Sequence, residues 1–209
     1  MTVFCPRAAA CALMVLVVSG SPAWAGAPTE ALRHSIDRIF ALLDDPAFKD
    51  GERAVARQRE LLALADSGVD FSEAARRTLG ATWDGRTPAE RAHFVRLFAD
   101  VIAHAYFKHI AHHGVRIAYD EEISMGKDVI VRARAFRNRG DATPVAFAMR
   151  EGDDGKWRVF DVSFAGMSLV GTYRAQFMRV IRTGSYEELV NRLETKAGTD
   201  TDGMQRSAP

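Results

Sequence analysis

The amino-acid sequence predicts an α+β fold, with about six helices and a four-stranded antiparallel sheet. The first half of the chain carries apolar residues at helical spacing, in segments that run to about residue 112. Four segments of alternating polarity, joined by short polar turns, follow between Gly114 and Gly166. Helical spacing then returns. Helices and strands are therefore segregated, whereas an α/β fold would alternate them along the chain.

Three helices are predicted before residue 80. The first begins near Thr29 and is stopped by Pro46, since proline cannot continue a helix. Its apolar residues at helical spacing are Leu32, Ile36, Ile39, Phe40 and Leu43. A charged helix follows over about 51–65. The third begins at Asp70, whose carboxylate can cap it, and Glu73 three residues later supports this start.

Thr87 begins the longest predicted helix, which runs to about residue 112. Threonine is a good N-cap, Pro88 suits the first helical position, and Glu90 can return a hydrogen bond to the cap. A continuous apolar stripe follows at helical spacing. It consists of Phe94, Leu97, Phe98, Val101, Ile102, Ala105 and Tyr106. Such a stripe predicts that one face of this helix is buried.

The strand region is predicted to form antiparallel hairpins, because its polar turns are short. The predicted strands are residues 115–124, 129–137, 144–151 and 157–164. After Gly166, Ser168 caps a helix that ends near Gly184. Ser185 then begins the last helix.

Small apolar residues occupy one face of the predicted sheet. Because alternate residues share a face, the second strand separates Val129, Val131 and Ala133 from the charged Arg132 and Arg134. The later strands add Ala146, Ala148, Phe160 and Val162 as small or apolar alternating positions. Small residues beneath long helices leave volume, and an empty cavity costs roughly 24 cal/mol per Å³. Either larger side chains or a ligand must fill it, and the pattern alone favours a filled core.

The first 25 residues have the three parts of a secretory signal. Arg7 precedes a short apolar run, and Ala23-Trp24-Ala25 provides a cleavage site of small residues, so we expect cleavage after Ala25. The run is shorter than the roughly 20 apolar residues that span a bilayer. Both cysteines lie in this segment, so the mature protein contains no thiol. We expect one domain over 26–196 and a polar, disordered tail over 197–209.

Several classes of function lack the residues they need. Removal of Arg7 leaves equal numbers of basic and acidic side chains, so the charge does not indicate a polyanion partner. No zinc-protease, nucleophile-elbow, P-loop or dinucleotide motif occurs. His104, His109, His112 and His113 cluster, but no carboxylate stands at matching helical spacing, so structural or solvated histidines are favoured over a metal site. We expect no metal, no cofactor and no catalytic residue.

Four stretches of the sequence, in their order and spacing, resemble a known family. They are Asp70-Phe71 with Thr78-Leu79-Gly80 and Trp83; Thr87 to Arg91 with Phe94, Leu97-Phe98 and Tyr106; Trp157 to Val162 with Gly166 to Val170; and Tyr173 to Phe177 with Ile181-Arg182 and Ser185 to Leu189. Together they resemble the Mla-pathway periplasmic phospholipid-binding proteins, the MlaC-type or toluene-tolerance family. Met167 and Gly171-Thr172 are mild departures from the family pattern.

The resemblance implies a periplasmic phospholipid carrier and not an enzyme. In such a protein a curved antiparallel sheet, shaped as an NTF-like cone, is wrapped by a helical subdomain, and the lipid tails occupy an apolar cavity between them. The implied partners are a phospholipid, an inner-membrane ABC lipid transporter complex and an outer-membrane lipoprotein complex, and the protein is expected to be a monomer that binds no nucleic acid. The lipid headgroup is expected to stay in water at the mouth of this cavity.

The expected lipid-binding residues combine the helical stripe with the small sheet face. They are Phe94, Phe98, Val101, Ile102, Tyr106, Val129, Val131, Ala133, Ala146, Ala148, Phe160, Val162, Leu169, Tyr173 and Phe177. The main alternative is a cone-shaped α+β enzyme acting on a hydrophobic small molecule, with Tyr119, Asp120 and Asp161 as candidate acids and bases. A carrier of another lipid, such as a hopanoid, and an adaptor subunit with a filled core are the others.

Overall fold

The computed structural model describes residues 26–45, 54–110, 115–137 and 142–205. Within them the α+β prediction is confirmed, with seven helices and five strands in the order α1 (Ala27–Asp44), α2 (Ala54–Gly68), α3 (Phe71–Leu79), α4 (Ala81–Asp84), α5 (Pro88–Ile110), β1 (Val115–Met125), β2 (Asp128–Arg137), β3 (Ala142–Glu151), β4 (Trp157–Phe164), β5 (Met167–Ser168), α6 (Leu169–Thr183) and α7 (Tyr186–Gln205). The predicted export signal, His112 and His113 lie outside the described residues. α7 continues past Lys196, where the sequence predicts the domain to end.

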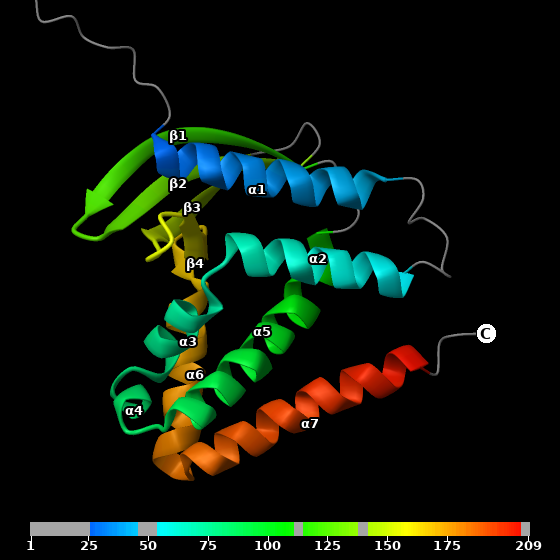
Figure 1. Ribbon diagram of the computed structural model, residues 1–209, viewed down its shortest axis with the longest axis vertical. Helices are drawn as coiled ribbons and strands as arrows, with labels where there is room; N and C mark the ends of the chain where they lie inside the picture. The colour runs from blue at the N-terminus through cyan, green and yellow to red at the C-terminus, as the bar shows by residue number, and fades with distance from the viewer. Residues whose placement is uncertain (1–25, 46–53, 111–114, 138–141, 206–209) are drawn as a thin grey trace, which may run out of the picture.

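The strands form one antiparallel sheet in the order β1-β2-β3-β4-β5. Four strands were expected, and the fifth, β5, is only two residues long, too short to show a period-two pattern. Register shifts occur between Tyr119 and Glu121 and between Ala148 and Met149. Such bulges increase the local twist, and β1 and β2 arch accordingly in Figure 1.

The predicted helix starts are confirmed by their hydrogen bonds. The amide of Glu73 donates to the Asp70 carboxylate at 2.9 Å. The amide of Thr87 donates to the Glu90 carboxylate at 2.7 Å, and the Glu90 amide donates to the Thr87 hydroxyl at 3.3 Å, which completes a capping box. The Ser168 hydroxyl accepts from the Gly171 amide at 2.8 Å.

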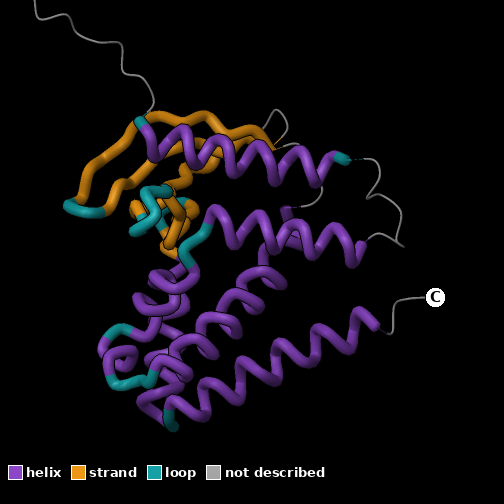
Figure 2. Tube along the Cα trace, in the orientation of Figure 1, coloured by secondary structure: helices purple, strands orange, loops and turns teal. Residues whose placement is uncertain are grey.

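Two separate groups of buried apolar residues hold the molecule together. The sheet cluster lies between α1 and the sheet and contains Leu32, Val131, Ala133, Val145, Phe147, Met149 and Val159. The helical cluster lies among α3 to α7 and contains Ala74, Ala75, Leu79, Trp83, Phe94, Leu97, Phe98, Val101, Val170, Phe177, Tyr186, Leu189 and Leu193. Figures 1 and 2 show the same division, with α1 along the sheet and α3 to α7 grouped at the other end.

An ion-pair network joins α3 to the sheet between these two clusters. Glu73, only 8% exposed, accepts hydrogen bonds from Arg76, Arg77 and Arg150 at 2.7–2.8 Å. Asp128 at the start of β2 accepts from Arg77 and Arg150, both at 2.7 Å. Burial opposes the ionisation of Glu73, but hydrogen bonds and charge from Arg76 and Arg77 outweigh it and lower the pKa of Glu73 to about 2. The network therefore stays ionised at neutral pH.

Candidate functional site

Phe94, Phe98 and Val101, three of the expected site residues of the long helix, belong to a filled aromatic core. Phe94 and Phe98 are 0% and 1% exposed, and Phe177 of α6 is 4% exposed. The Phe98 ring stands edge-on to the rings of Phe177 and Tyr173, at 6.0 and 5.5 Å between centroids. Val101 is buried in the same cluster. These side chains fill the space between α5 and α6 with one another, as the filled-core interpretation predicts for this part.

The small face of β2 lies beneath α1. Val131 is 0% exposed and Ala133 is 3% exposed, and both belong to the sheet cluster with Leu32 of α1. Val129 and Val162 are half-buried against the same cluster. The structure therefore brings these four expected residues together on one face of the sheet.

Ala146 and Ala148 do not share that face. In the β2–β3 pairing, Ala146 lies opposite Arg132 and Ala148 opposite Ile130, whereas Val131 lies opposite Phe147. Directly paired residues of an antiparallel sheet point to the same side. Arg132 pairs with Glu121 at 2.8 Å, and both side chains are more than half exposed. Ala146 and Ala148 therefore lie on the outer, charged face, so they do not line one cavity with Val131 and Ala133.

The remaining expected residues lie on α5, β4 and α6. Ile102 and Tyr173 are half-buried against the helical cluster, and Leu169 is half-buried in the first turn of α6. Phe160 is 4% exposed, because the Arg77 guanidinium covers its ring at 3.8 Å. Tyr106 belongs to α5, but its side chain lies outside the described residues.

A half-buried apolar layer lies under the C-terminal half of α1, and the sequence did not predict it as a site. Leu32 and Ile36 pack against the sheet cluster, and Ile39, Phe40 and Leu43 continue the same helix face at helical spacing. Ile117 of β1 and Ala135 of β2 are half-buried on the inner sheet face. We name this set, Ile36, Ile39, Phe40, Leu43, Ile117 and Ala135, the α1–sheet layer. The sequence contained one indication of this layer. The apolar face of the first helix runs from Leu32 to Leu43, but only Leu32 on that face is fully buried.

The α1–sheet layer leaves apolar surface accessible to solvent. Each of its six members is half-buried, as are the apolar side chains that surround the helical cluster. Leaving apolar surface in water costs roughly 25 cal/mol per Å². A ligand with apolar chains would remove that surface from water, so this layer is a candidate for holding one.

Tyr119 stands at the border of the layer. It is half-buried against the sheet cluster, and the Arg33 guanidinium lies 5.0 Å from its ring centroid. Burial raises the pKa of Tyr119 to about 12, and the charge of Asp37 adds to the effect. The phenol is therefore neutral at physiological pH and can donate a hydrogen bond at this border.

The candidate acids and bases do not form a catalytic arrangement. Asp120 is engaged with Arg134 at 2.7 Å on the outer face, where that hydrogen bond lowers the pKa of Asp120. Asp161 accepts from the Ser168 hydroxyl at 2.5 Å and from the Val170 amide at 2.9 Å, so it caps α6. Tyr119 lies on the inner face. In the parts of the chain that the structure describes, no group of three metal-binding side chains is present.

A separate cleft of about 480 Å³ opens between α3 and α6. Its charged lining consists of Arg76, Arg77, Arg174, Asp84 and Asp161, around Phe160 and Val170. Such a mixed lining of guanidinium and carboxylate groups is unsuited to acyl chains. Of the expected lipid-binding residues, only Phe160 is among those that line this cleft, so the cleft does not match the apolar cavity that the sequence predicts.

No helix in the described segments is long and apolar enough to cross a membrane. The chain matches the family model described as "MlaC protein" over residues 33–195. A solved structure of the phospholipid-binding protein from Ralstonia solanacearum, in complex with a phospholipid, is similar with a TM-score of 0.70. The two sequences are 21% identical, and the match covers 83% of this chain and 98% of that chain, so the likeness shows the fold. No curated protein matches the chain.

Proposed function

Because the chain belongs to the MlaC protein family, we propose that it is a periplasmic phospholipid carrier. The observation that supports this most directly is the α1–sheet layer, a set of apolar side chains that the protein itself leaves half-buried. The Ralstonia solanacearum protein of the same fold is in complex with a phospholipid. The segregation of helices and strands alone would not favour a lipid over any other hydrophobic ligand.

We propose that the acyl chains lie against the α1–sheet layer and against the half-buried Val129 and Val162 of the same sheet face. Two acyl chains contain on the order of 30 methylene groups, and each costs roughly 0.8 kcal/mol to expose to water. A protein surface of comparable apolarity lowers that cost during transfer. Tyr119 and Arg33 stand at the border of the layer, where they can meet a polar headgroup. The aromatic residues of the helical cluster form the scaffold that supports this half.

The proposed pathway is the exchange of phospholipid between an outer-membrane lipoprotein complex and an inner-membrane ABC transporter complex. Family membership supports this proposal, and the export signal expected over residues 1–25 would deliver the protein to the compartment between the two membranes. Carriage requires neither a covalent step nor a metal. The dispersed positions of Tyr119, Asp120 and Asp161 give no support to the alternative of an enzyme.

Two tryptophan substitutions on opposite sheet faces test the proposed lipid position. Ala135 is half-buried on the inner face and Ala148 is half-buried on the outer face, so Ala135→Trp and Ala148→Trp are matched in size. Native mass spectrometry of the purified proteins, with solvent extraction, measures and identifies the bound lipid. We expect Ala135→Trp to lose most of the lipid while Ala148→Trp keeps it.

Circular dichroism and thermal unfolding show whether both variants fold. Ala133→Trp is less suitable, because Ala133 is 3% exposed and overpacking a core costs about 1–3 kcal/mol. Full lipid occupancy in a folded Ala135→Trp variant would refute the assignment to the α1–sheet layer. A wild-type protein that carries no lipid would refute the function itself.

A further inference from the structure

The turn between β4 and β5 presents an apolar tip to solvent. Phe164 is 46% exposed and Met167 is 71% exposed, and with Met125 they are the large hydrophobic residues that stand out as exposed in the described chain. Phe164 and Met167 pair across the hairpin, so their side chains lie on the same side. A Cβ added at Gly166 would meet nothing within 4 Å, which shows that the turn projects from the surface. We name Phe164–Met167 the hairpin tip.

The hairpin tip is held in a defined conformation. Ala165 has φ 48° and Gly166 has φ 83°, both in the left-handed region. The Ala165 amide donates to the Pro144 carbonyl at 2.9 Å, which ties the turn to β3. The Ser168 hydroxyl donates to Asp161, which fixes the end of the hairpin to β4. The two apolar side chains are therefore presented without the entropy cost of ordering a loop.

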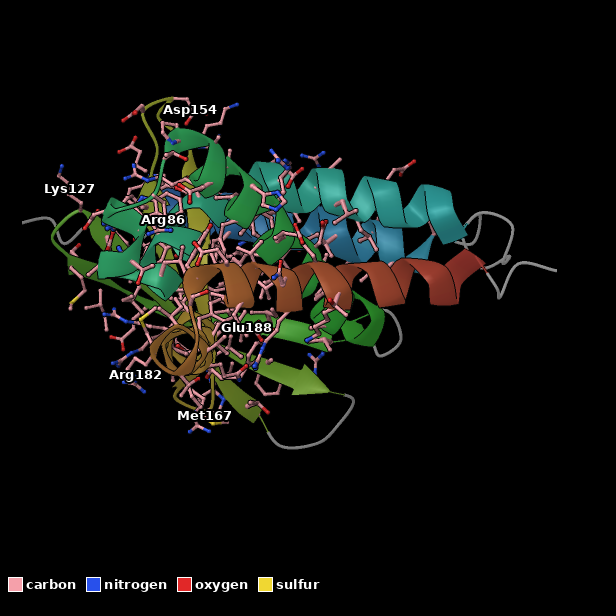
Figure 3. The ribbon with its side chains drawn as sticks, turned by 90° about the horizontal axis from the view of Figure 1, so that it is seen from below. Arg86, Lys127, Asp154, Met167, Arg182 and Glu188 are labelled. Atoms are coloured by element: carbon pink, nitrogen blue, oxygen red, sulfur yellow. The ribbon has the colours of Figure 1, made fainter. Side chains whose placement is uncertain are left out.

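α6, which begins directly after the tip, is purely basic. It carries Arg174, Arg179 and Arg182 and no aspartate or glutamate, and all three arginines are exposed. None of them forms an ion pair with a carboxylate of the described residues, in contrast to Arg132 and Arg134 on the outer sheet face. Met167 precedes α6 and Arg182 lies in its last turn, so the length of the helix separates them. Figure 3, which looks along α6, shows both labels below the centre of the helix in that view.

We infer that the hairpin tip and the exposed face of α6 form a docking surface for an anionic phospholipid bilayer. Phenylalanine and methionine side chains gain by entering the apolar edge of a bilayer, and guanidinium groups pair with lipid phosphates. The field of an anionic membrane attracts each basic side chain near its surface. This surface lies outside the α1–sheet layer, so the inference goes beyond the proposed function and does not depend on it.

The size of the patch favours a bilayer over a protein partner. Specific protein interfaces bury about 1,200–2,000 Å² around a continuous apolar centre. Two neighbouring apolar side chains, at one end of a helix whose unpaired arginines are spread along its length, provide no such centre. A bilayer requires only an apolar tip that inserts and basic groups that meet the headgroups. The charge of α6 is complementary to anionic lipid.

Sedimentation of the full protein with large unilamellar vesicles tests this inference. We expect binding to vesicles of phosphatidylcholine mixed with phosphatidylglycerol, little binding to phosphatidylcholine alone, and weaker binding as salt is raised. The double substitution Phe164→Ser with Met167→Ser removes the tip, and Met125→Ser is its control at another exposed methionine. The double substitution Arg179→Gln with Arg182→Gln removes two basic groups, and Arg132→Gln with Arg134→Gln is its charge-matched control.

We expect each docking variant to bind anionic vesicles on the order of tenfold more weakly than wild type, with the controls unchanged. Bound lipid, measured by mass spectrometry, is expected to remain at the wild-type level in all four variants. Failure of the wild-type protein to sediment with anionic vesicles would overturn the inference and leave the tip as a protein-contact surface. If the control variants lost as much vesicle binding as the docking variants, the loss would not be specific to the hairpin tip and α6. That result would also overturn the inference.

Discussion

At the residue scale, Glu73 connects the helical half to the sheet. It is a buried carboxylate with three arginine partners from α3 and β3. Asp128 repeats the pattern with two of the same arginines. Removing one member of a buried ion-pair network leaves the other charges uncompensated, which costs more than the network itself contributes.

Glu73→Gln is therefore expected to lower the free energy of unfolding by about 2–3 kcal/mol. The full cost of breaking a buried pair is about 3–5 kcal/mol, but the side chains of Arg77 and Arg150 are 29% and 30% exposed, so water screens part of it. Urea denaturation measures the change. Glu121→Gln, which breaks the exposed pair with Arg132, is the control and is expected to cost no more than about 1 kcal/mol. Equal losses of unfolding free energy in Glu73→Gln and Glu121→Gln would contradict the larger contribution expected of the buried network.

The pH dependence of stability follows from the same residue. The pKa of Glu73 falls from 4.5 to about 2 on folding, so its ionised form is favoured in the folded state. Its contribution is complete above pH 4.5 and is lost as the pH falls from 4.5 toward 2. Urea unfolding at a series of pH values is expected to show a steeper loss over this range for wild type than for Glu73→Gln. Parallel curves for the two proteins would contradict the assignment.

At the element scale, α1 does two different things along its length. Its N-terminal half is fixed to the sheet, because Leu32 is buried and the Thr29 amide donates to the Glu122 carboxylate of β1 at 2.9 Å. Its C-terminal half carries Ile39, Phe40 and Leu43, which stay half-buried. A helix of uniform apolar pattern is thus divided into a structural half and a half that belongs to the candidate site.

Alanine substitutions in the two halves are expected to separate stability from lipid binding. Leu32→Ala creates a cavity in the sheet cluster and is expected to cost about 2–5 kcal/mol in the free energy of unfolding. Phe40→Ala removes a half-buried ring and is expected to cost about 1 kcal/mol in the lipid-free protein, but to reduce lipid occupancy strongly. Chemical denaturation and native mass spectrometry measure the two quantities. Unchanged occupancy in Phe40→Ala would exclude this half of α1 from the site.

At the scale of the whole molecule, the two buried clusters predict that a bound ligand stabilises the sheet half more than the helical half. The helical cluster is packed with its own aromatic side chains, whereas the α1–sheet layer consists of half-buried side chains and is the proposed lipid position. A ligand that binds only the folded state stabilises it, by about 2.7 kcal/mol at 100 times its Kd. We expect that stabilisation to originate in the sheet half.

Hydrogen exchange of lipid-bound and lipid-free protein measures this distribution. Lipid removal is expected to lower the melting temperature and to speed exchange in α1, β1 and β2, while α3 and α6 change little. An exchange response concentrated in α3, α5 and α6 would instead place the lipid among the aromatic residues of the helical cluster.

Local signals in the sequence were sufficient for most of the elements. The caps at Asp70, Thr87 and Ser168 depend on hydrogen bonds between residues three positions apart, so their residue types predict them. The hairpin turns are equally local. α4 and β5 were missed because segments of four and two residues are too short to show a period.

The sequence by itself determined the α+β class, the helix starts, the order of the strands and the resemblance to the family, because each depends on local chemistry or on the order of motifs. Only the tertiary structure decided which residues share a space. Val131 and Ala148 look alike in their strands, yet the pairing of β2 with β3 places them on opposite faces. Phe98 and Phe40 look alike in their helices, yet one fills a core and the other stays half-buried. Burial and register arise from contacts between distant segments, and a pattern within one segment does not contain them.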